Sequence, residues 1–190
     1  ARFRDDGTGE WLPLTHGVGP LTEANGFRSQ AELVINTRRA GDLLGGTKMD
    51  RPEDVEANPV SGKVYAALTG NDRRKPEQVD KANPRANNKF GHIIELVEDG
   101  GDHAATRFRW EIFIKGGDPK NPDHQAYYQG HTDVSPLATP DNFAFEESGR
   151  LWVATDGIDD ALGANDGIFV VDTEGPERGR GPLPSVAHEV

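Results

Sequence analysis

The sequence contains no cysteine, and this absence excludes two kinds of stabilising or reactive site. Neither a disulfide nor a thiolate metal site can be built from its 190 residues. The cysteine content therefore does not distinguish an oxidising from a reducing compartment. The 6 histidines show neither H-x-H nor H-x-x-x-H spacing, so a zinc site is weakly supported and surface or packing roles are favoured for them.

Long hydrophobic runs and an excess of positive charge are also missing. No apolar stretch approaches the roughly 20 residues of a membrane span, and no signal-peptide pattern is present. The 21 lysines and arginines are outnumbered by 32 acidic residues, for a net charge of −11. Nucleic acids and anionic membranes are therefore not expected as partners, because both bind basic surfaces. The sequence also has no G-x-S-x-G, Walker or Rossmann motif.

Glycine and proline, by contrast, are abundant and predict a mainly β protein with short elements. The chain has 23 glycines and 13 prolines at 34% hydrophobic content, which disfavours a bundle of long helices. One inserted helix is expected over residues 27–44, with Ser29 as the N-cap and Glu32 completing a capping box. Its apolar face is predicted to comprise Ala31, Val34, Ile35, Ala40, Leu43 and Leu44.

Strands are expected on both sides of this helix. Residues 1–14 fit a hairpin in which Trp11 and Leu12 pack inward. Residues 91–97 and 106–114 read as paired strands, and residues 168–172 as a further strand. Alternation along the second of the paired strands predicts one face with Phe108, Trp110, Ile112 and Ile114 and another with Arg107, Arg109, Glu111 and Phe113.

The central feature of the sequence is a hairpin motif that occurs twice. Residues 48–71 read as an acidic loop, a strand, an S-G turn and a second strand, and residues 139–157 repeat this order. P-E-D-V aligns with P-D-N-F, and S-G-K-V-Y aligns with S-G-R-L-W after one residue is dropped from the turn. Because a propeller blade takes about 40–50 residues, this spacing predicts a β-propeller, with the motif in every second blade or once per blade with a long insertion.

On this interpretation residues 1–190 form one partial propeller domain. Residues 1–49 hold the leading hairpin and helix, residues 50–115 the first repeat unit, and residues 116–190 the second. A complete ring needs at least about four blades, so the chain is expected to be part of a larger ring. Unpaired blades expose strand edges, and association with remaining propeller segments or with another copy is therefore expected.

Acids and amides recur in the loops before the repeated strands and predict a cation site. In a propeller such loops open on the central channel, where Glu53 and Asp54 of the first unit would meet Asp141 and Asn142 of the second. Ca²⁺ takes about six to eight oxygen ligands, which carboxylates and amides supply. The alternative for Asp54 and Asp141 is that they only cap turns.

The polar segment over residues 69–89 is too long for a structural hairpin loop, and we expect it to be functional. Three asparagines gather near its end, together with Arg85. Arg51 and Arg85 lie beside the proposed cation loops in the sequence. Either guanidinium could bind an oxyanion through two parallel hydrogen bonds.

Several strings of the sequence resemble the PhoX-type alkaline phosphatases, from about Trp11 to the C-terminus. They are M-D-R-P-E-D-V-E (49–56), A-N-P-R-A-N-N-K-F-G-H-I (82–93), G-D-H-A-A-T-R-F-R-W-E-I-F (101–113), P-D-N-F-A-F (140–145) and T-E-G-P-E-R-G (173–179). The resemblance implies a secreted bacterial phosphomonoesterase, exported by the twin-arginine route to the periplasm or beyond. It also implies an embellished six-bladed propeller with Ca²⁺ and iron in its channel.

The resemblance implies roles for individual residues as well. Glu53 matches an acid that ligates the metal cluster of the family. Glu189 matches the acid of an A-E-V string, from which this sequence departs by an additional histidine. Asn87, Asp141 and Asn142 match positions that face the channel. The cysteine that ligates iron in the family lies upstream of the matching segment, so Fe³⁺ is implied here without that ligand.

The implied reaction is metal-assisted hydrolysis of phosphate monoesters, with Glu53 and Arg85 as the expected catalytic residues and an arginine clamping the phosphate. One alternative is a Ca²⁺-dependent propeller lactonase of the gluconolactonase or paraoxonase type, which has a similar acid or amide loop before a comparable strand. The string over residues 82–89 favours the phosphatase, because the lactonase pattern does not require it. A second alternative is an inactive propeller fragment.

Overall fold

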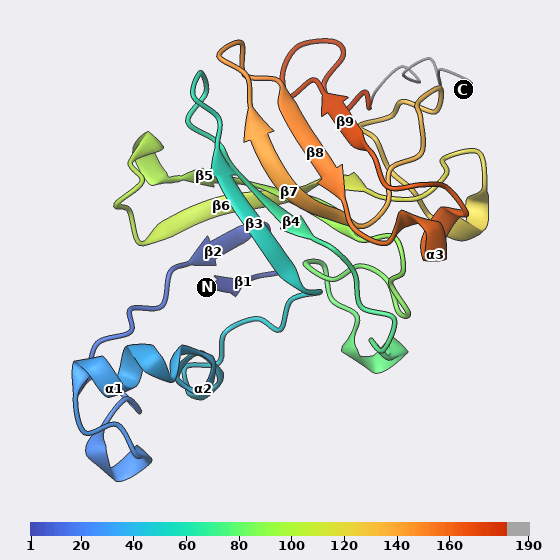
Figure 1. Cartoon of the computed structure of the whole chain (residues 1–190). Coiled ribbons are helices and arrows are strands. Elements are labelled where there is room, and N and C mark those ends of the chain that lie inside the picture. The colour runs from blue at the N-terminus through green and yellow to red at the C-terminus, as the bar shows by residue number, and fades with distance from the viewer. Residues whose placement is uncertain (182–190) are drawn as a thin grey trace. The chain divides into compact units, whose positions relative to one another are not determined.

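The computed structural model describes residues 1–181, and these residues form two compact units. Unit 1 comprises residues 1–48 and 98–109, and unit 2 comprises residues 49–97 and those from 110 onward. The chain is mainly β, as predicted (Figure 1). The division into repeat units at residues 50 and 116 stays a prediction. No helix within the described part of the chain is long and apolar enough to cross a membrane.

The expected leading hairpin is present in unit 1. Trp11, which follows it, packs on Phe108 with 5.1 Å between ring centroids, although Trp11 is 38% exposed. Leu12 is half-buried, so the predicted inward packing is confirmed in part. The paired strands of this unit are β1 (Arg2–Phe3), β2 (Thr8–Glu10) and the first residues of β6 (Arg107–Lys115).

The single helix predicted over residues 27–44 is wrong, because the structure has two helices there. They are α1 (Gln30–Ile35) and α2 (Thr37–Leu43), and Asn36 lies between them outside helical geometry. The predicted N-cap is confirmed, since the Ser29 hydroxyl accepts a hydrogen bond from the Glu32 amide at 3.1 Å. The Glu32 carboxylate accepts from the Arg28 amide instead of completing a capping box with Ser29.

The predicted apolar face of this helix is also wrong in part. Val34 and Ile35 are exposed, whereas Leu33, which the prediction left out, is fully buried. The break at Asn36 shifts the helical phase, so residues before and after it no longer share one stripe. The buried cluster of these helices comprises Leu21, Phe27, Leu33 and Ala40.

Unit 2 contains two sheets, which lie beside each other (Figure 1). Their strand orders are β6-β5-β4-β3 and β7-β8-β9. The strands are β3 (Pro52–Ala57), β4 (Val64–Leu68), β5 (His92–Glu98), β7 (Pro140–Phe145), β8 (Leu151–Thr155) and β9 (Ile168–Val171). Short helical turns in the connections are η2 (Pro76–Gln78), η4 (Pro122–His124) and α3 (Ile158–Leu162).

The repeated hairpin is confirmed, and both copies contain the same register shift. β3 pairs with β4 and β7 with β8, both antiparallel, and each first strand shifts register directly after its proline. The residue before each proline has a left-handed backbone, with φ 54° at Arg51 and φ 50° at Thr139. Equivalent sequence therefore produces an equivalent bulge at the same end of both hairpins.

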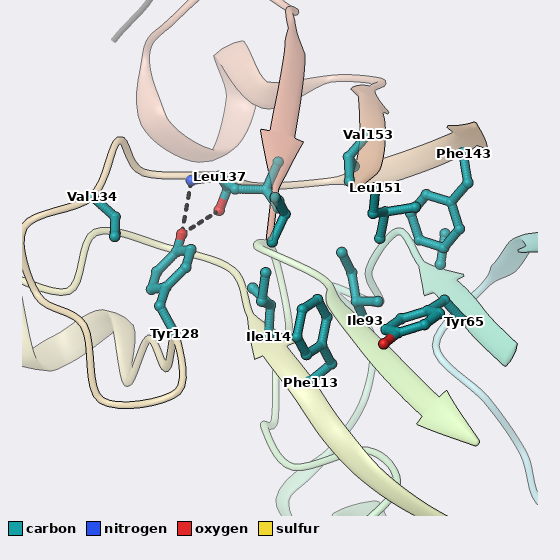
Figure 2. Packing of buried hydrophobic residues seen from close by; sticks show 12 residues of the cluster. Tyr65, Ile93, Phe113, Ile114, Tyr128, Val134, Leu137, Phe143, Leu151 and Val153 are labelled. Carbon is teal, nitrogen blue, oxygen red and sulfur yellow. Dashed lines mark hydrogen bonds between the residues drawn. The ribbon is translucent and has the colours of Figure 1, made fainter. Parts of the chain in front are cut away.

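One core is shared by the two sheets of unit 2 (Figure 2). Its buried members are Tyr65, Ala67, Ile93, Phe113, Ile114, Tyr128, Val134, Leu137, Phe143, Leu151, Val153 and Val171. Strand alternation predicted Phe113 on the charged face of β6, yet its side chain is fully buried. The reason is that this face of the strand is covered, since the rings of Tyr65 and Phe113 have centroids 5.2 Å apart.

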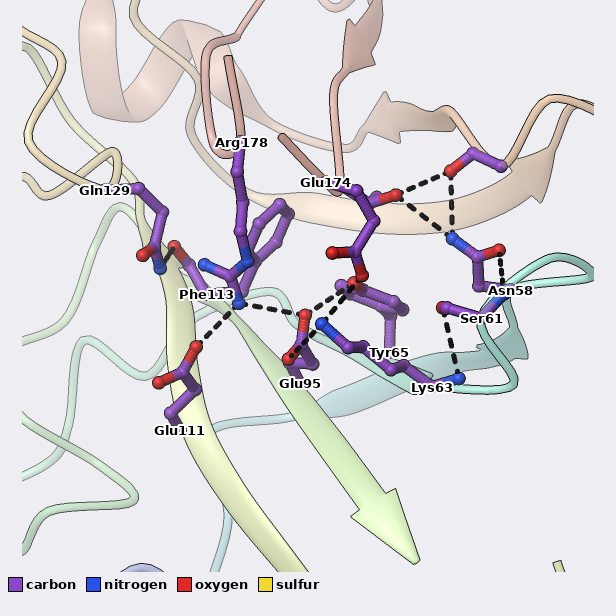
Figure 3. A network of polar contacts seen from close by, with 12 residues as sticks. Asn58, Ser61, Lys63, Tyr65, Glu95, Glu111, Phe113, Gln129, Glu174 and Arg178 are labelled. Carbon is purple, nitrogen blue, oxygen red and sulfur yellow. Dashed lines mark hydrogen bonds and ion pairs between the residues drawn. The ribbon is translucent and has the colours of Figure 1, made fainter. Parts of the chain in front are cut away.

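The segment after β9 is anchored over β4, β5 and β6 by a charged network (Figure 3). The Arg178 guanidinium donates to Glu95 at 2.9 Å and to Glu111 at 2.6 Å, and it lies 4.9 Å from the Phe113 ring centroid. The Tyr65 hydroxyl donates to Glu95 at 2.5 Å. Burial, followed by this hydrogen bond, raises the pKa of Tyr65 well above its ordinary value, so the phenol stays protonated.

Candidate functional site

A cleft of ≈ 700 Å³ lies in unit 2, where the second strand of each repeated hairpin ends. Its walls come from three regions: Arg51 and Thr139, which precede β3 and β7; residues 69–73 and 88–89 of the long polar loop; and residues from 156 to 161 after β8. The repeat thus places equivalent positions of both hairpins at one cleft.

Arg51 and Thr139 line this cleft with strained backbones. A positive φ in a residue other than glycine costs on the order of 1–3 kcal/mol and is often found at functional sites. The strain is held by equivalent hydrogen bonds, because the Arg51 carbonyl accepts from the Thr69 amide at 3.0 Å and the Thr139 carbonyl accepts from the Asp156 amide at 3.1 Å. The buried Thr139 hydroxyl has no hydrogen-bond partner within residues 1–181.

Two of the predicted metal ligands, Glu53 and Asp141, lie near this end of the hairpins. Glu53 forms an ion pair with Arg51 at 3.2 Å. Burial, together with the charges of Glu53 and Asp156, raises the pKa of the Asp141 carboxyl. These acids are therefore close enough to repel one another. A bound cation would offset this repulsion.

Asp54, by contrast, joins the two hairpins. Its Oδ1 accepts from the Val55 amide and its Oδ2 from the Phe143 amide, both at 2.8 Å. Both oxygens of this carboxylate are thus engaged with backbone groups of β3 and β7. We conclude that Asp54 positions the second hairpin against the first.

The remaining predicted ligands do not meet at the cleft. Asn87 is exposed with φ 47°, and its amide donates to the Arg74 carbonyl at 2.8 Å. Asn142 is exposed on β7 just after the bulge. Neither residue lines the cleft. Glu189 lies outside the described residues.

Arg85, the predicted phosphate clamp, is buried with 7% exposure. Its guanidinium donates to the carbonyls of Gly116 at 2.7 Å and His124 at 2.9 Å, and also to that of Gly91. Burial lowers its pKa to about 10, so the side chain remains a cation at neutral pH. Arg85 therefore fastens the loop after β6 to the start of β5, and it does not line the cleft.

A buried polar network under the cleft was not predicted from the sequence. Asp50 is fully buried and accepts from Arg74 Nε at 2.5 Å and from Asn88 Nδ2 at 3.0 Å. Asn71 and Asn88 exchange two backbone hydrogen bonds, at 2.7 and 2.9 Å. These contacts close the base of the long polar loop and hold its two ends together.

His92 completes this network as a neutral imidazole. Its Nε2 donates to the Ala82 carbonyl at 2.8 Å, so its Nδ1 accepts from Asn88 Nδ2 at 3.3 Å. Burial lowers its pKa to about 4, and the nearby Arg85 and Arg74 act in the same direction against the charge of Asp50. A packing role for this histidine, which the sequence favoured, agrees with its full burial.

We expect this imidazole to make the fold less stable in acid. Because the pKa of His92 is about 4 in the folded chain and about 6.5 when unfolded, the unfolded chain alone binds the proton between these values. The free energy of unfolding therefore falls as the pH drops through this window, by up to about 3 kcal/mol. Urea unfolding at pH 7, 6 and 5 of the chain and of His92→Gln measures this effect.

The stability difference between the chain and His92→Gln should shrink as the pH drops. His131→Gln serves as the control for loss of a histidine outside the buried network, since His131 is only half-buried. A His92→Gln difference that is the same at all three pH values would contradict a neutral buried imidazole.

The donor set near the cleft fits part of a site for a hard cation. Glu53, Asp141 and Asp156 supply carboxylate oxygens, the ligand type that Ca²⁺ prefers. No group of three or more histidines or acids within residues 1–181 is arranged to hold a metal ion by itself. These residues thus fit as contributors to a metal site that needs further ligands.

Comparisons with known proteins agree on one family. A family model described as alkaline phosphatase PhoX matches residues 1–180. Among solved structures, the chain is similar to Pseudomonas fluorescens PhoX in complex with vanadate, a transition state analogue, at 33% sequence identity and a TM-score of 0.83 over 95% of this chain. The match covers 33% of that chain, so the present chain spans about a third of its length. No curated protein matches the sequence.

Proposed function

The chain belongs to the PhoX family of alkaline phosphatases, and on that basis we propose that its cleft is part of a metal-dependent site for phosphate monoesters. Water would cleave the P–O ester bond and release the alcohol and inorganic phosphate. The observation that carries this proposal is the pairing of Arg51 with Glu53 at 3.2 Å beside the cleft. An anion-binding group and a cation-binding group thus lie next to each other, as phosphoryl transfer requires.

Arg51, in preference to Arg85, is the phosphate clamp of this proposal. Arg51 lines the cleft and its side chain is 60% exposed, so its guanidinium can reach a ligand. The ion pair with Glu53 and the strained backbone limit the orientations of the side chain. A planar guanidinium held in this way binds two phosphate oxygens with little further loss of entropy.

The metal ligands of the proposal are Glu53 and Asp141, with Asp156 as an additional candidate beside them. Asn87, Asn142 and Glu189 remain proposed ligands from the family resemblance. Bound Ca²⁺ and Fe³⁺ would polarise the phosphoryl group and offset the negative charge that develops on it. The carboxylates beside the cleft make an incomplete ligand set, so the other ligands are proposed to come from outside residues 1–181.

For the architecture, we infer that the two sheets of unit 2 are neighbouring blades of a six-bladed propeller. The repeated hairpin, its repeated bulge and the shared core support this inference. Remaining propeller segments or another copy are the proposed neighbours of these blades. A periplasmic or secreted location follows from the family resemblance and is part of the same proposal.

Hydrolysis of 4-nitrophenyl phosphate at alkaline pH, with and without added Ca²⁺, tests the proposed function. We expect turnover that requires Ca²⁺ and that drops by at least about 100-fold in Glu53→Gln, because the variant loses a charge that supports the metal and Arg51. Glu56→Gln is the matched control, since Glu56 is exposed on the same strand, whereas the ion pair of Arg51 is with Glu53.

Two outcomes contradict the proposal. Turnover that is equal in Glu53→Gln and Glu56→Gln would remove Glu53 from the site. Absence of phosphatase turnover in the unaltered chain would favour the inactive fragment, and Ca²⁺-dependent hydrolysis of a lactone in its place would favour the lactonase.

A further inference from the structure

The buried network under the cleft is flanked by positive charge. Each of three residues in this network is adjacent in the chain to a cation that lines the cleft. The network residues are buried and bonded to one another, so the backbone that carries these cations is fixed. The pairs of network residue and cation are Asp50 with Arg51, Arg74 with Arg73, and Asn88 with Lys89.

Two of these cations have no ion-pair partner in the part of the chain that the structure describes. Arg51 is paired with Glu53, but neither Arg73 nor Lys89 forms a salt bridge with any residue of the described range 1–181. Both side chains are exposed. In a chain with a net charge of −11, two unpaired cations on one cleft wall indicate a negatively charged ligand. The acids that line the same cleft are Asp72, Asp156 and Asp160.

We propose that Arg73 and Lys89 bind a second phosphate group of the substrate, while Arg51 binds the phosphate that is hydrolysed. This inference rests on the proposed function and deepens it, because it selects organic phosphates that carry two phosphate groups. The cleft volume of ≈ 700 Å³ lies within the ~300–1,000 Å³ that enclose a whole small-molecule ligand. Charge-assisted hydrogen bonds from arginine and lysine to phosphate oxygens supply the selectivity.

The rigid base of the loop means that this second site is largely preformed. Arg74 and Asn88 are 7% and 1% exposed, and the isolated Asn71–Asn88 bridge joins the two ends of the loop, which carry Arg73 and Lys89. The backbone that carries both cations is therefore held at one wall before any ligand binds. Preorganised charges of this kind lose less entropy on binding than charges on a mobile loop.

Calorimetric titration of the chain with inorganic pyrophosphate and with orthophosphate, in EDTA to remove metal, tests the inference. We expect pyrophosphate to bind at least about tenfold more tightly than orthophosphate, since two additional charged donors contact it. In Arg73→Gln/Lys89→Gln this preference should fall to within about twofold, with orthophosphate affinity unchanged. Arg38→Gln/Lys120→Gln removes the same charge outside the cleft lining and should keep the preference.

The charge-conserving variant Arg73→Lys/Lys89→Arg separates binding from folding, and it should retain most of the preference for pyrophosphate. The inference is overturned if the chain does not prefer pyrophosphate, or if the preference survives in Arg73→Gln/Lys89→Gln. The two proposals can fail separately. If the chain shows no phosphatase turnover but its preference for pyrophosphate depends on Arg73 and Lys89, the second anion site stands and only the proposed hydrolysis is contradicted.

Discussion

Replacement of Asp50 by asparagine is expected to destabilise the fold by about 3–5 kcal/mol, which is among the largest effects of any single substitution in unit 2. Asp50 and Arg74 form an ion pair at 2.5 Å, with side chains 0% and 6% exposed. The variant keeps the shape of the side chain but removes the carboxylate charge that pairs with the buried guanidinium, and removal of one partner from a buried pair carries this cost. Urea unfolding at pH 7 measures the loss.

The same substitution at a surface ion pair is the control. Asp133 pairs with Lys120 at 3.5 Å, with side chains 95% and 67% exposed, and Asp133→Asn should leave the free energy of unfolding unchanged within error. In Asp50→Asn/Arg74→Met both charges are removed, so this double variant should be more stable than Asp50→Asn. Equal stability of Asp50→Asn and Asp133→Asn would show that the buried pair contributes nothing.

The Asp50–Arg74 pair joins residues that are distant in sequence. This is why much of the fold, but few of its buried polar contacts, could be predicted from the sequence. The hairpins have local signals, because turn residues and alternating apolar residues lie within a few positions of each other. The repeat of these signals predicted two equivalent hairpins. The structure adds the bulge that follows Pro52 and Pro140 and the left-handed residue before each proline.

Contacts between residues distant in sequence have no such signal. Asp50 belongs to the acidic loop at the start of residues 48–71, and nothing in the sequence pairs it with Arg74. Arg85 and Asp54 were read as site residues from their residue type, yet Arg85 binds backbone carbonyls and Asp54 binds backbone amides. Charged residues that satisfy buried backbone groups have the same sequence appearance as charged residues that bind ligands.

The break between α1 and α2 illustrates a third limit. The apolar spacing in residues 27–44 was continuous enough to predict one helix, but Asn36 adopts φ −102° and ψ 36°. The Asn36 side chain donates to the Glu32 carbonyl at 2.8 Å, a local hydrogen bond that competes with helix continuation. Asparagine in the middle of a helical pattern was therefore the available signal for the break.

Truncation of Phe113 provides the second large effect and distinguishes strand alternation from the observed packing. Alternation places Phe113 with Arg109 and Glu111 toward solvent, where Phe113→Ala would change stability by less than about 0.5 kcal/mol. The structure buries the ring completely, against Tyr65 and under Arg178. We therefore expect Phe113→Ala to lower the free energy of unfolding by about 3–5 kcal/mol, through lost burial and the cavity left behind.

Two further variants make this measurement specific. Ile168→Ala truncates an aliphatic side chain that is 68% exposed on β9, and its effect should stay within about 0.5 kcal/mol. Phe113→Leu fills most of the volume and should cost less than half as much as Phe113→Ala. If Phe113→Ala costs no more than Ile168→Ala, the charged face of β6 is open to solvent and the segment after β9 does not cover it. If Phe113→Ala lowers the free energy of unfolding by the expected amount, the segment after β9 covers this face of β6. Arg178 then packs on a face that strand alternation predicted to be exposed to solvent.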